Sequence, residues 1–320
     1  MPDTEILPSS QPAVTILMAT YNGAAYLPAQ LDSLAAQQGV NWRLVISDDG
    51  STDATAERVA RFAARFPAGQ VRMQQGPGQG ATQNFLSLLD QVADGEWLAF
   101  CDQDDVWHPD KLNRAVKALQ DQPAAAIYSA RTTIADQNLK PLAGSRRFTR
   151  PLGLRNALVQ AVTAGNTLVA NAPAAALLRR AGPAARTADV VSHDWWAYLL
   201  ASAAGAALVR DEAEVLLYRQ HPGNVMGRND TALALAARLR LLLAGPFGGW
   251  LAANLRAVLA VRDMLTPDAV TLLEQVQAAQ RRPGMALAAE LWRLGVYRQT
   301  RAGTAALYLA ALAGALRDKG

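Results

Sequence analysis

Three carboxylates stand close together in the segment Asp102-Gln103-Asp104-Asp105. The run before them, 97–101, is uncharged and rich in aromatic residues, which is typical of a buried strand. Pro109 and the apolar spacing over 112–119 predict that a helix follows, with the proline in its first turn. Ligands of open α/β sheets bind just outside the carboxyl ends of strands. Carboxylates gathered there repel one another unless a cation offsets them, and oxygen ligands suit Mg²⁺ or Mn²⁺ held against a diphosphate.

Two further polar clusters follow predicted strands. Thr20-Tyr21-Asn22-Gly23 follows the apolar run 14–19, and Asp48-Asp49-Gly50-Ser51 follows the run 44–47. Right-handed crossovers place successive parallel strand ends at one edge of a sheet, so we expect the three clusters to converge. The second cluster can equally form a turn and a helix cap, since Asp-Gly and Ser are ordinary there. A cap accounts for one carboxylate at 102–105 but not for three.

The elements that must position these clusters follow from the apolar rhythm of the first 130 residues. Short apolar runs alternate with helical spacing there, which predicts an α/β fold with a Rossmann-like, mostly parallel sheet flanked by helices. The rhythm then loosens, and we expect 131–155 to be a loop or excursion. Three later segments, 161–170, 207–210 and 214–220, are predicted strands, and 194–203 is a predicted helix. From 231 onward the pattern predicts a helical C-terminal extension.

Composition narrows the class of protein. The 320 residues are 51% hydrophobic and 18% charged, which indicates a globular chain with a sizeable core. Cys101 is the only cysteine, so an intramolecular disulfide and a thiolate metal cluster are excluded. The first residues lack the basic-then-apolar order of a signal peptide, and we expect a cytoplasmic protein. No segment shows the roughly 20 apolar residues of a membrane span.

Charge divides the chain into two parts. Residues 1–225 hold 19 Lys and Arg against 21 Asp and Glu, whereas 226–320 hold 12 against 6. We therefore expect a domain over 1–225 and a basic helical region over 226–320. Basic amphipathic helices can lie on an anionic membrane surface. They can equally pack on the domain with solvated arginines, and the sequence leaves both interpretations open.

The three motifs together carry a resemblance to a known family. The strings VTILMATYNGAAYLPAQLDSL, VISDDGSTDAT and GEWLAFCDQDDVWHPDKL resemble the family 2 glycosyltransferases, over residues 12–227. The resemblance implies a GT-A fold, a nucleotide-sugar bound by the first half, 12–107, and an acceptor and catalytic half, 108–225. It also implies inverting transfer and a divalent metal, Mg²⁺ or Mn²⁺. The F-x-D-Q-D-D-x-W form is most similar to bacterial rhamnosyltransferases and related polysaccharide enzymes.

Carried over by motif, the resemblance implies roles for individual residues. Thr20 and Tyr21 would line the base pocket, Asp48 would contact the base, Asp102 the ribose and Asp104 the metal. The whole implied nucleotide-sugar set is Thr20, Tyr21, Asn22, Asp48, Asp49, Asn84, Asp102, Gln103, Asp105 and Arg219. His221 would be a further metal ligand or a partner of the diphosphate.

Two of these residues have an equally good ordinary interpretation. Asn84 can be a helix-face asparagine, and His221 a surface-loop histidine. Arg219 would offset the charge of the leaving group.

The segment His193-Asp194-Trp195-Trp196 resembles the part of the family that presents the catalytic base, often Glu-Asp there and His-Asp here. Inverting transfer needs a carboxylate that takes the proton of the acceptor hydroxyl, and Asp194 is the candidate. Trp195 and Trp196 would form an apolar platform for a sugar or lipid acceptor. The alternative is that Asp194 caps a helix whose tryptophans belong to the core.

Other functions predict different ligands. Gly76-Pro77-Gly78-Gln79-Gly80-Ala81 fits the dinucleotide pattern G-x-G-x-x-A, so an NAD-dependent oxidoreductase would bind NAD without metal. A nucleotidyltransferase would add a basic Gly-rich loop, but 20–25 contains no lysine or arginine. A non-catalytic nucleotide-sugar binding module would tolerate loss of Asp194. Nucleic-acid binding is unsupported, because the basic excess has no matching groove motif.

The sequence therefore predicts a cytoplasmic enzyme, peripheral at the inner face of the plasma membrane. It would transfer a single sugar, because no Gln-x-x-Arg-Trp string of processive synthases is present. The candidate donor is dTDP-rhamnose. The acceptor would be a glycan or a lipid-linked glycan of cell-surface polysaccharide synthesis.

Overall fold

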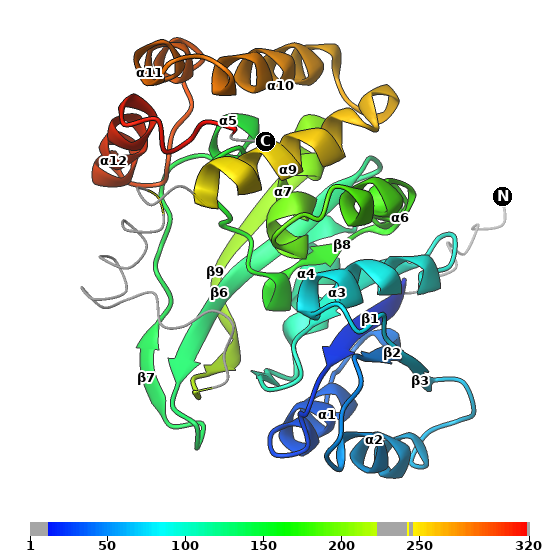
Figure 1. The fold of residues 1–320 in the computed structure, drawn as a ribbon. Coiled ribbons are helices and arrows are strands. Elements are labelled where there is room, and N and C mark those ends of the chain that lie inside the picture. Colours follow the sequence, from blue (N-terminus) through cyan, green and yellow to red (C-terminus); the bar gives the residue numbers. More distant parts are fainter. Residues whose placement is uncertain (1–11, 223–241, 243–245, 319–320) are drawn as a thin grey trace, which may run out of the picture.

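Four parallel strands form one half of the sheet in a computed structural model that describes residues 12–222, 242 and 246–318 (Figure 1). They lie in the order β3-β2-β1-β4. Their bounds are β1 (Ala13–Thr20), β2 (Asn41–Asp48), β3 (Val71–Gln75) and β4 (Trp97–Cys101). The central pair, β1 and β4, is buried almost throughout, as expected for uncharged apolar runs covered on both faces.

The helices of this half follow the strands as predicted. Their bounds are α1 (Leu27–Ala35), α2 (Thr55–Ala63), α3 (Ala81–Leu88), η1 (Leu89–Gln91) and α4 (Lys111–Leu119). Leu27, Leu31 and Leu34 of α1 are buried at i, i+4 and i+7, because they share one face of the helix. Helix α4 begins at Lys111, so Pro109 precedes the helix and does not lie in its first turn as predicted. The alternation of strand and helix that the sequence predicts is confirmed.

The other half of the sheet is mixed, in the order β4-β8-β6-β9-β5, with β7 paired to β6. The bounds are β5 (Val106–Trp107), β6 (Ala126–Ala135), β7 (Pro141–Gly144), β8 (Val169–Ala170) and β9 (Ala207–Arg219). Strand β8 is antiparallel to both β4 and β6, and β9 is parallel to β6. The carboxyl ends of β1, β2, β4, β6 and β9 therefore lie at the same edge of the sheet.

Three predictions for this half were wrong. The segment 131–155 is not all loop, since it holds the end of β6 and the whole of β7. Only two residues of the predicted strand 161–170 are strand, those of β8. The predicted strands 207–210 and 214–220 form one strand, β9. The physical reason is the charge of the β6–β9 ribbon. Arg131 of β6 forms an ion pair with Glu214 of β9 at 3.0 Å, so polar residues that suggested a loop pair across two long strands.

Helices cover this half and extend beyond it (Figure 1). Their bounds are α5 (Leu154–Ala157), η2 (Gly165–Thr167), α6 (Ala172–Thr187), α7 (His193–Ala203), α9 (Pro246–Leu259), η3 (Arg262–Met264), α10 (Pro267–Gln280), α11 (Gly284–Arg293) and α12 (Arg301–Leu312). Trp195 of α7 packs against Phe247 of α9, with ring centroids 5.4 Å apart. One hydrophobic core runs from Leu17 of β1 to Leu316 after α12, so the described C-terminal helices pack on the domain.

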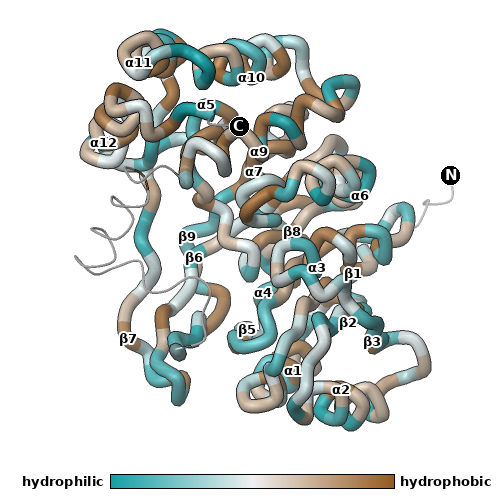
Figure 2. Tube along the Cα trace, in the orientation of Figure 1, coloured by the Kyte–Doolittle hydropathy of each residue, from teal (hydrophilic) through white to brown (hydrophobic). Residues whose placement is uncertain are grey.

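Figure 2 shows hydrophobic stretches of the chain both on the helices and within the sheet. The predicted boundary at 225 and the predicted start of the helical region at 231 lie outside the described residues. Across the described ranges, no helix combines the length and the apolar character needed to cross a bilayer.

Candidate active site

The loops after β1 and β4 are tied together by one side chain. The Gln103 amide accepts a hydrogen bond from the Tyr21 N–H at 3.0 Å and donates one to the Tyr21 carbonyl at 3.1 Å. A side chain at Gly23 would collide with Gln103, since an added Cβ would lie 2.2 Å from Oε1. Gln103 therefore positions the β1 loop and leaves the ring of Tyr21 exposed beside it.

Asp48 organises the end of β2. Its carboxylate accepts from Thr20 Oγ1 at 2.7 Å, from Ser51 Oγ at 2.6 Å and from the Ser51 N–H at 2.8 Å. Asn22, which adopts a φ of 45°, accepts from the Thr52 N–H at 2.9 Å. These bonds join the ends of β1 and β2 as the predicted convergence requires, and they also form the turn that the alternative interpretation describes.

Asp49 holds the glycine loop that follows β3. Its two carboxylate oxygens accept from the N–H groups of Gly78 and Gly80, each at 2.7 Å. Both glycines have positive φ, 69° and 87°, where residues with a side chain are disfavoured. The two N–H groups that a dinucleotide pyrophosphate would require are thus already occupied, and this loop gives the oxidoreductase alternative no support.

Asn84 of α3 contacts the end of β2 from the protein interior. Its Nδ2 donates to the Ser47 carbonyl at 2.8 Å, and the side chain is buried. An added Cβ at Gly76 would meet Asn84 Oδ1 at 2.8 Å, so the chain passes close to this amide. In the structure Asn84 supports the backbone at the end of β2.

The end of β9 meets the carboxylate loop directly. His221 Nε2 lies 2.8 Å from Asp104 Oδ2, and the His221 ring stacks on Tyr26 with centroids 4.4 Å apart. The Arg219 guanidinium lies 4.8 Å from the centroid of the same tyrosine and donates to the Asp104 carbonyl at 2.8 Å. The structure thus brings Asp104 together with Arg219 and His221, which lie 115 and 117 residues further along the chain.

Asp105 points into the protein. It is fully buried, its Oδ2 accepts from Asn166 Nδ2 at 2.6 Å, and its Oδ1 accepts from the Arg219 N–H at 3.3 Å. Burial and the charges of Asp102 and Asp104 raise the pKa of Asp105 well above its usual value. Asp105 therefore fixes the loop against η2 and β9.

Behind these carboxylates lies a buried cation. Lys111 has no exposed surface, its Nζ lies 3.3 Å from the centroid of the Trp107 ring, and Nζ has no hydrogen-bond partner. Burial lowers the pKa of Lys111 to about 7, although the charges of Cys101, Asp105 and Asp102 oppose this shift. An ammonium so placed offsets part of the negative charge of the loop.

The pKa of Asp102 depends on the charged residues around it. Burial, together with the charges of Asp104 and Asp194, raises its pKa to about 7, and Lys111 opposes the increase. Consecutive residues of η2 contact both segments, because the Gly165 N–H donates to Asp194 and Asn166 Nδ2 donates to Asp105, so the start of α7 and the loop after β4 face the same site. Strongly shifted carboxylates of this kind gather where a ligand supplies the missing charge.

Asp194 stands in the first turn of α7. Its Oδ2 accepts from the Gly165 N–H at 3.0 Å, and its Oδ1 accepts from the Trp195 N–H at 2.7 Å and from Ser192 Oγ. His193 stacks on Phe85, with centroids 4.1 Å apart, and burial lowers the pKa of its imidazole. Gly165 must lack a side chain, because an added Cβ would lie 2.7 Å from His193 Nε2.

The predicted acceptor platform is wrong. Trp195 and Trp196 are buried in the hydrophobic core, and Trp195 Nε1 donates to the Ala157 carbonyl at 2.7 Å. Both lie under α9 and neighbouring helices, because α7 is apolar on several faces and needs cover. The alternative interpretation, that these tryptophans belong to the core, is the correct one.

A comparison with known sequences identifies the family to which the chain belongs. The model of the family described as Glycosyl transferase family 2 matches residues 15–181, which include the ends of β1, β2 and β4. The chain belongs to glycosyltransferase family 2. The matched residues thus include the polar clusters at the ends of these three strands.

Two relatives of this glycosyltransferase are similar over 70% and 65% of its length. The dTDP-rhamnosyl transferase RfbG of Shigella flexneri is 28% identical over 230 residues, which are 70% of this chain and 78% of RfbG. An uncharacterized protein of Mycobacterium tuberculosis is 30% identical over 215 residues, 65% of this chain, and the matched part spans 59% of that protein's length.

Solved structures share the fold. The mannosyltransferase PcManGT of Pyrobaculum calidifontis, in complex with GDP-Man and Mn²⁺, has a TM-score of 0.50 at 21% identity, covering 96% of this chain and 87% of the other. TarS of S. aureus, residues 1–349 in complex with UDP, has a TM-score of 0.51 at 13% identity, covering 95% and 89%. The glycosyltransferase therefore has a GT-A fold, as the resemblance implied.

Three residues of this glycosyltransferase, Tyr26, Lys111 and Asn166, contact the predicted site residues although the sequence did not indicate them. Tyr26 carries the contacts of Arg219 and His221, and Asn166 holds Asp105. None lies in a polar cluster at a strand end, so local pattern gave no signal for them. Lys111 stands in the string HPDKL, where nothing distinguishes a buried lysine from a solvated one.

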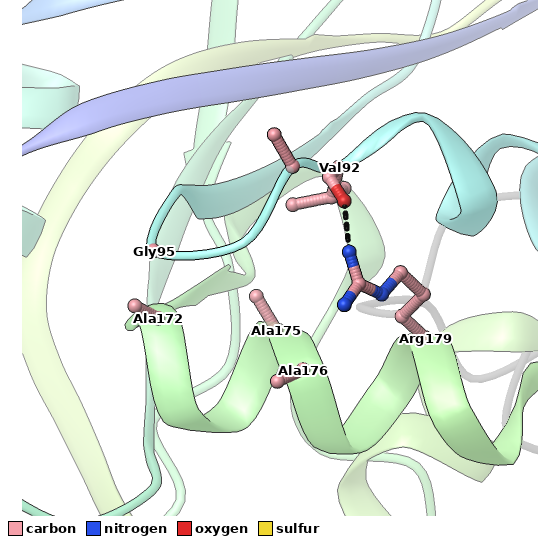
Figure 3. A pocket seen from close by; sticks show the side chains of 7 residues that line it. Val92, Gly95, Ala172, Ala175, Ala176 and Arg179 are labelled. Atoms are coloured by element: carbon pink, nitrogen blue, oxygen red, sulfur yellow. Dashed lines mark hydrogen bonds between the residues drawn. The ribbon is translucent and has the colours of Figure 1, made fainter.

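A small pocket lies away from this site, at the opposite edge of the sheet before β4 (Figure 3). Arg179 Nη1 closes one side by donating to the Val92 carbonyl at 2.7 Å. The residues lining it are Val92, Ala93, Gly95, Ala172, Ala175, Ala176 and Arg179. Mostly small apolar side chains offer no acid, base or nucleophile, so this pocket takes no part in the chemistry.

Proposed function

We propose that this glycosyltransferase transfers a single sugar with inversion from a nucleotide-sugar, using a divalent metal, to a glycan or lipid-linked acceptor in cell-surface polysaccharide synthesis. Rhamnose carried by dTDP is the leading candidate donor, supported by the similarity to RfbG. The observation that carries the proposal is the contact between Asp104 and His221, 2.8 Å apart, among the carboxylates of Asp102, Asp105 and Asp194.

The residues at the ends of β1 and β2 suit the base and ribose of a nucleotide. Tyr21 presents an exposed ring on which a base can stack, and Thr20 with Asp48 forms the adjoining polar floor. Asp102, with its raised pKa, can accept from or donate to a ribose hydroxyl. We therefore assign the donor to residues 12–107 and the acceptor and catalytic groups to 108–225.

The residues present fit a divalent metal. Asp104 supplies a carboxylate oxygen and His221 a ring nitrogen at one point. Within the described ranges, no three His, Cys, Asp or Glu side chains are arranged to hold a metal by themselves. Mg²⁺ commonly takes one or two protein ligands and completes its shell with substrate phosphates and water, so Asp104 and His221 would hold it. When bound, it would stabilise the negative charge of the departing diphosphate.

Asp194 is the proposed general base. Hydrogen bonds from the N–H groups of Gly165 and Trp195 fix its carboxylate at the start of α7, where the helix dipole favours negative charge. A base held in this way can take the proton of the acceptor hydroxyl as that oxygen attacks the anomeric carbon. Arg219 keeps the Asp104 loop in place, through the Asp104 carbonyl, beside the leaving group.

The family assignment and the charge of the chain support a place for the enzyme at the cytoplasmic, inner face of the plasma membrane. Lipid-linked acceptors would be available there, and residues 226–320 carry 12 Lys and Arg against 6 Asp and Glu. The C-terminal region would then serve as a contact with the membrane in addition to its packing on the domain.

Calorimetric titration of the purified full chain tests the proposal. UDP, dTDP, GDP and NAD are each titrated with Mn²⁺ and with EDTA into wild type, Asp104→Ala and Asp121→Ala. Asp121 is an exposed carboxylate outside the site, so its variant controls for the loss of a negative charge. We expect one diphosphonucleotide to bind only with Mn²⁺, to lose at least about 100-fold in affinity in Asp104→Ala, and to bind Asp121→Ala normally.

Two results would overturn it. Metal-independent binding of NAD would favour the oxidoreductase. Failure of all four nucleotides to bind a chain whose circular dichroism shows it folded would return the carboxylates to a structural role.

A further inference from the structure

Helices α11 and α12 expose large apolar side chains. Met285 and Trp292 of α11 are 76% and 72% exposed, and Leu309 and Leu312 of α12 are 61% and 49% exposed. These four residues, here called the α11–α12 patch, are half of the eight large hydrophobic side chains that stand exposed on the described part of the chain. The other four are scattered over the site, β3, β7 and the segment before α7. An exposed tryptophan in such a cluster marks a surface that binds something.

The solvent-facing side of α12 contains no charged residue after Arg301. Every exposed position between 302 and 316 is alanine or leucine, whereas Leu307, Ala310 and Ala311 fill the opposite, buried face. A surface helix of a globular protein normally carries charged and polar residues on its outer face. Helix α12 is therefore apolar on both faces, and only one of them is covered by the protein.

The two halves of the patch are adjacent. An added Cβ at Gly284, the first residue of α11, would lie 2.2 Å from the carbonyl oxygen of Leu312 and 2.7 Å from that of Ala311. Met285 thus follows the point where α11 crosses the end of α12. Met285 and Trp292 are seven residues apart, which places both on one side of α11. In Figure 1 the two helices lie side by side at the end of the molecule remote from α1 and α2.

Basic residues flank the two helices of the patch along the chain. Arg281 and Arg282 precede α11, Arg301 begins α12 and Arg317 follows it, and all four are exposed. Between residues 281 and 318 the chain carries six arginines and two carboxylates. An apolar centre with a tryptophan and an arginine rim is the combination found on helices that lie in the interfacial region of anionic membranes.

We propose that the α11–α12 patch inserts into the surface of an anionic lipid bilayer. A second copy of the chain fits less well, because a two-fold contact through this patch would bring the arginine rim of one copy against that of the other. The inference rests on the proposed function only for its inner-membrane location, since it names the contact surface and does not depend on the sugar transferred.

Vesicle co-sedimentation of the full chain tests the patch. The vesicles are phosphatidylcholine alone and phosphatidylcholine mixed with phosphatidylglycerol, each at low and high salt. We expect binding to the anionic vesicles, weakened by salt because exposed charges are screened. The double variant Trp292→Ser/Leu309→Ser should lower the partition coefficient roughly one hundred-fold or more, since two large apolar side chains no longer enter the bilayer. Arg281→Gln/Arg282→Gln should lower it about ten-fold, on anionic vesicles only.

A matched control removes exposed apolar side chains elsewhere. Met73→Ser/Leu142→Ser, on β3 and β7, should bind vesicles as wild type does. Nucleotide affinity, measured on every variant, shows that the site is intact and reports on the proposed function separately.

Three results would overturn the inference. They are no binding of wild type to anionic vesicles, equal binding by the patch variant and wild type, and a wild-type dimer in light scattering that Trp292→Ser/Leu309→Ser converts to monomer without affecting vesicles.

Discussion

The two ends of strand β4 carry carboxylates in opposite electrostatic states. Glu96, just before the strand, accepts from Arg43 Nε at 2.9 Å, from Thr15 Oγ1 at 2.6 Å and from the Ala93 N–H at 3.0 Å. Burial opposes its ionisation, but the bonds from Arg43 and Thr15 outweigh burial and lower the pKa of Glu96 to about 2. Asp102, just after the strand, has its pKa raised to about 7 by burial and by the charges of Asp104 and Asp194.

The difference separates a structural carboxylate from a functional one. Glu96 has all the cationic and hydrogen-bonding partners it needs within the protein, so it stabilises the fold. Asp102 shares its site with Asp104 and Asp194, and the nearest buried cation, Lys111, offsets only part of their charge. A site that the protein leaves short of positive charge gains most from a metal and from a ligand's hydroxyl groups.

The largest effect is expected from Asp194→Asn, which keeps the shape of the side chain and removes its basicity. We predict that the transfer rate falls by about 10²–10⁴-fold while donor affinity changes little, because the base acts only on the acceptor. The assay follows turnover of the donor that calorimetry identifies, with water as acceptor where no glycan is at hand. Glu96→Gln, at the other end of β4, is the control and should keep the rate within about two-fold. An Asp194→Asn enzyme at wild-type rate would remove Asp194 from the mechanism.

The next effect concerns stability at the carboxyl end of β4. We predict that Lys111→Met lowers the free energy of unfolding by about 2–3 kcal/mol, because the carboxylate of Asp105 would stay buried without its nearby cation. Adding Asp105→Asn should recover part of that loss, giving an interaction energy of about 1–3 kcal/mol in denaturant unfolding. The pair Lys111→Met with Asp49→Asn is the control and should be additive. Additivity in both pairs would show that Lys111 is not the counter-ion of the loop.

Local pattern was enough to predict the first half of the fold and the convergence of its polar clusters at one edge of the sheet. The runs that became β1, β2 and β4 are apolar and uncharged, so burial on both faces was readable, and parallel strands bring their ends to one edge. The second half was harder, because β6 and β9 carry charged residues that pair with each other. Arg131 indicates a loop until its partner Glu214 on the neighbouring strand is known.

The site residues that sequence reasoning missed or misassigned depend on contacts between distant segments. Lys111 begins an ordinary helix, and only the packing of Trp107 and the loop above it makes the lysine a buried cation. Trp195 and Trp196 suggested an acceptor surface, yet the cover over them comes from α9 and other helices far along the chain. Burial of a single side chain is a property of the tertiary structure, which no local spacing encodes.

A smaller effect tests whether location or bonding decides the role of a carboxylate. Asp49 lies at the functional edge, but like Glu96 it is fully hydrogen-bonded, to the N–H groups of Gly78 and Gly80. We predict that Asp49→Ala lowers stability by about 1–2 kcal/mol, accelerates hydrogen exchange at both amides and weakens donor binding only a few-fold. Asp121→Ala should do none of these. Loss of donor binding with the two amides still protected would mean that Asp49 contacts the nucleotide directly.

The smallest effect is the pH dependence contributed by Glu96. Its pKa in the folded protein is about 2, below the ordinary value of 4.5, so the folded state binds this proton more weakly than the unfolded state. The stabilisation is therefore complete above pH 4.5 and is lost as the pH falls from 4.5 through about 2. Solvent screening of the partly exposed Arg43–Glu96 pair limits it to about 1 kcal/mol. Unfolding of wild type and Glu96→Gln between pH 7 and pH 3 measures it, and the two curves should converge as the pH falls. Parallel curves would show that Arg43 contributes no charge-dependent stability at this end of β4, and the contrast with Asp102 would then rest on the carboxyl end alone.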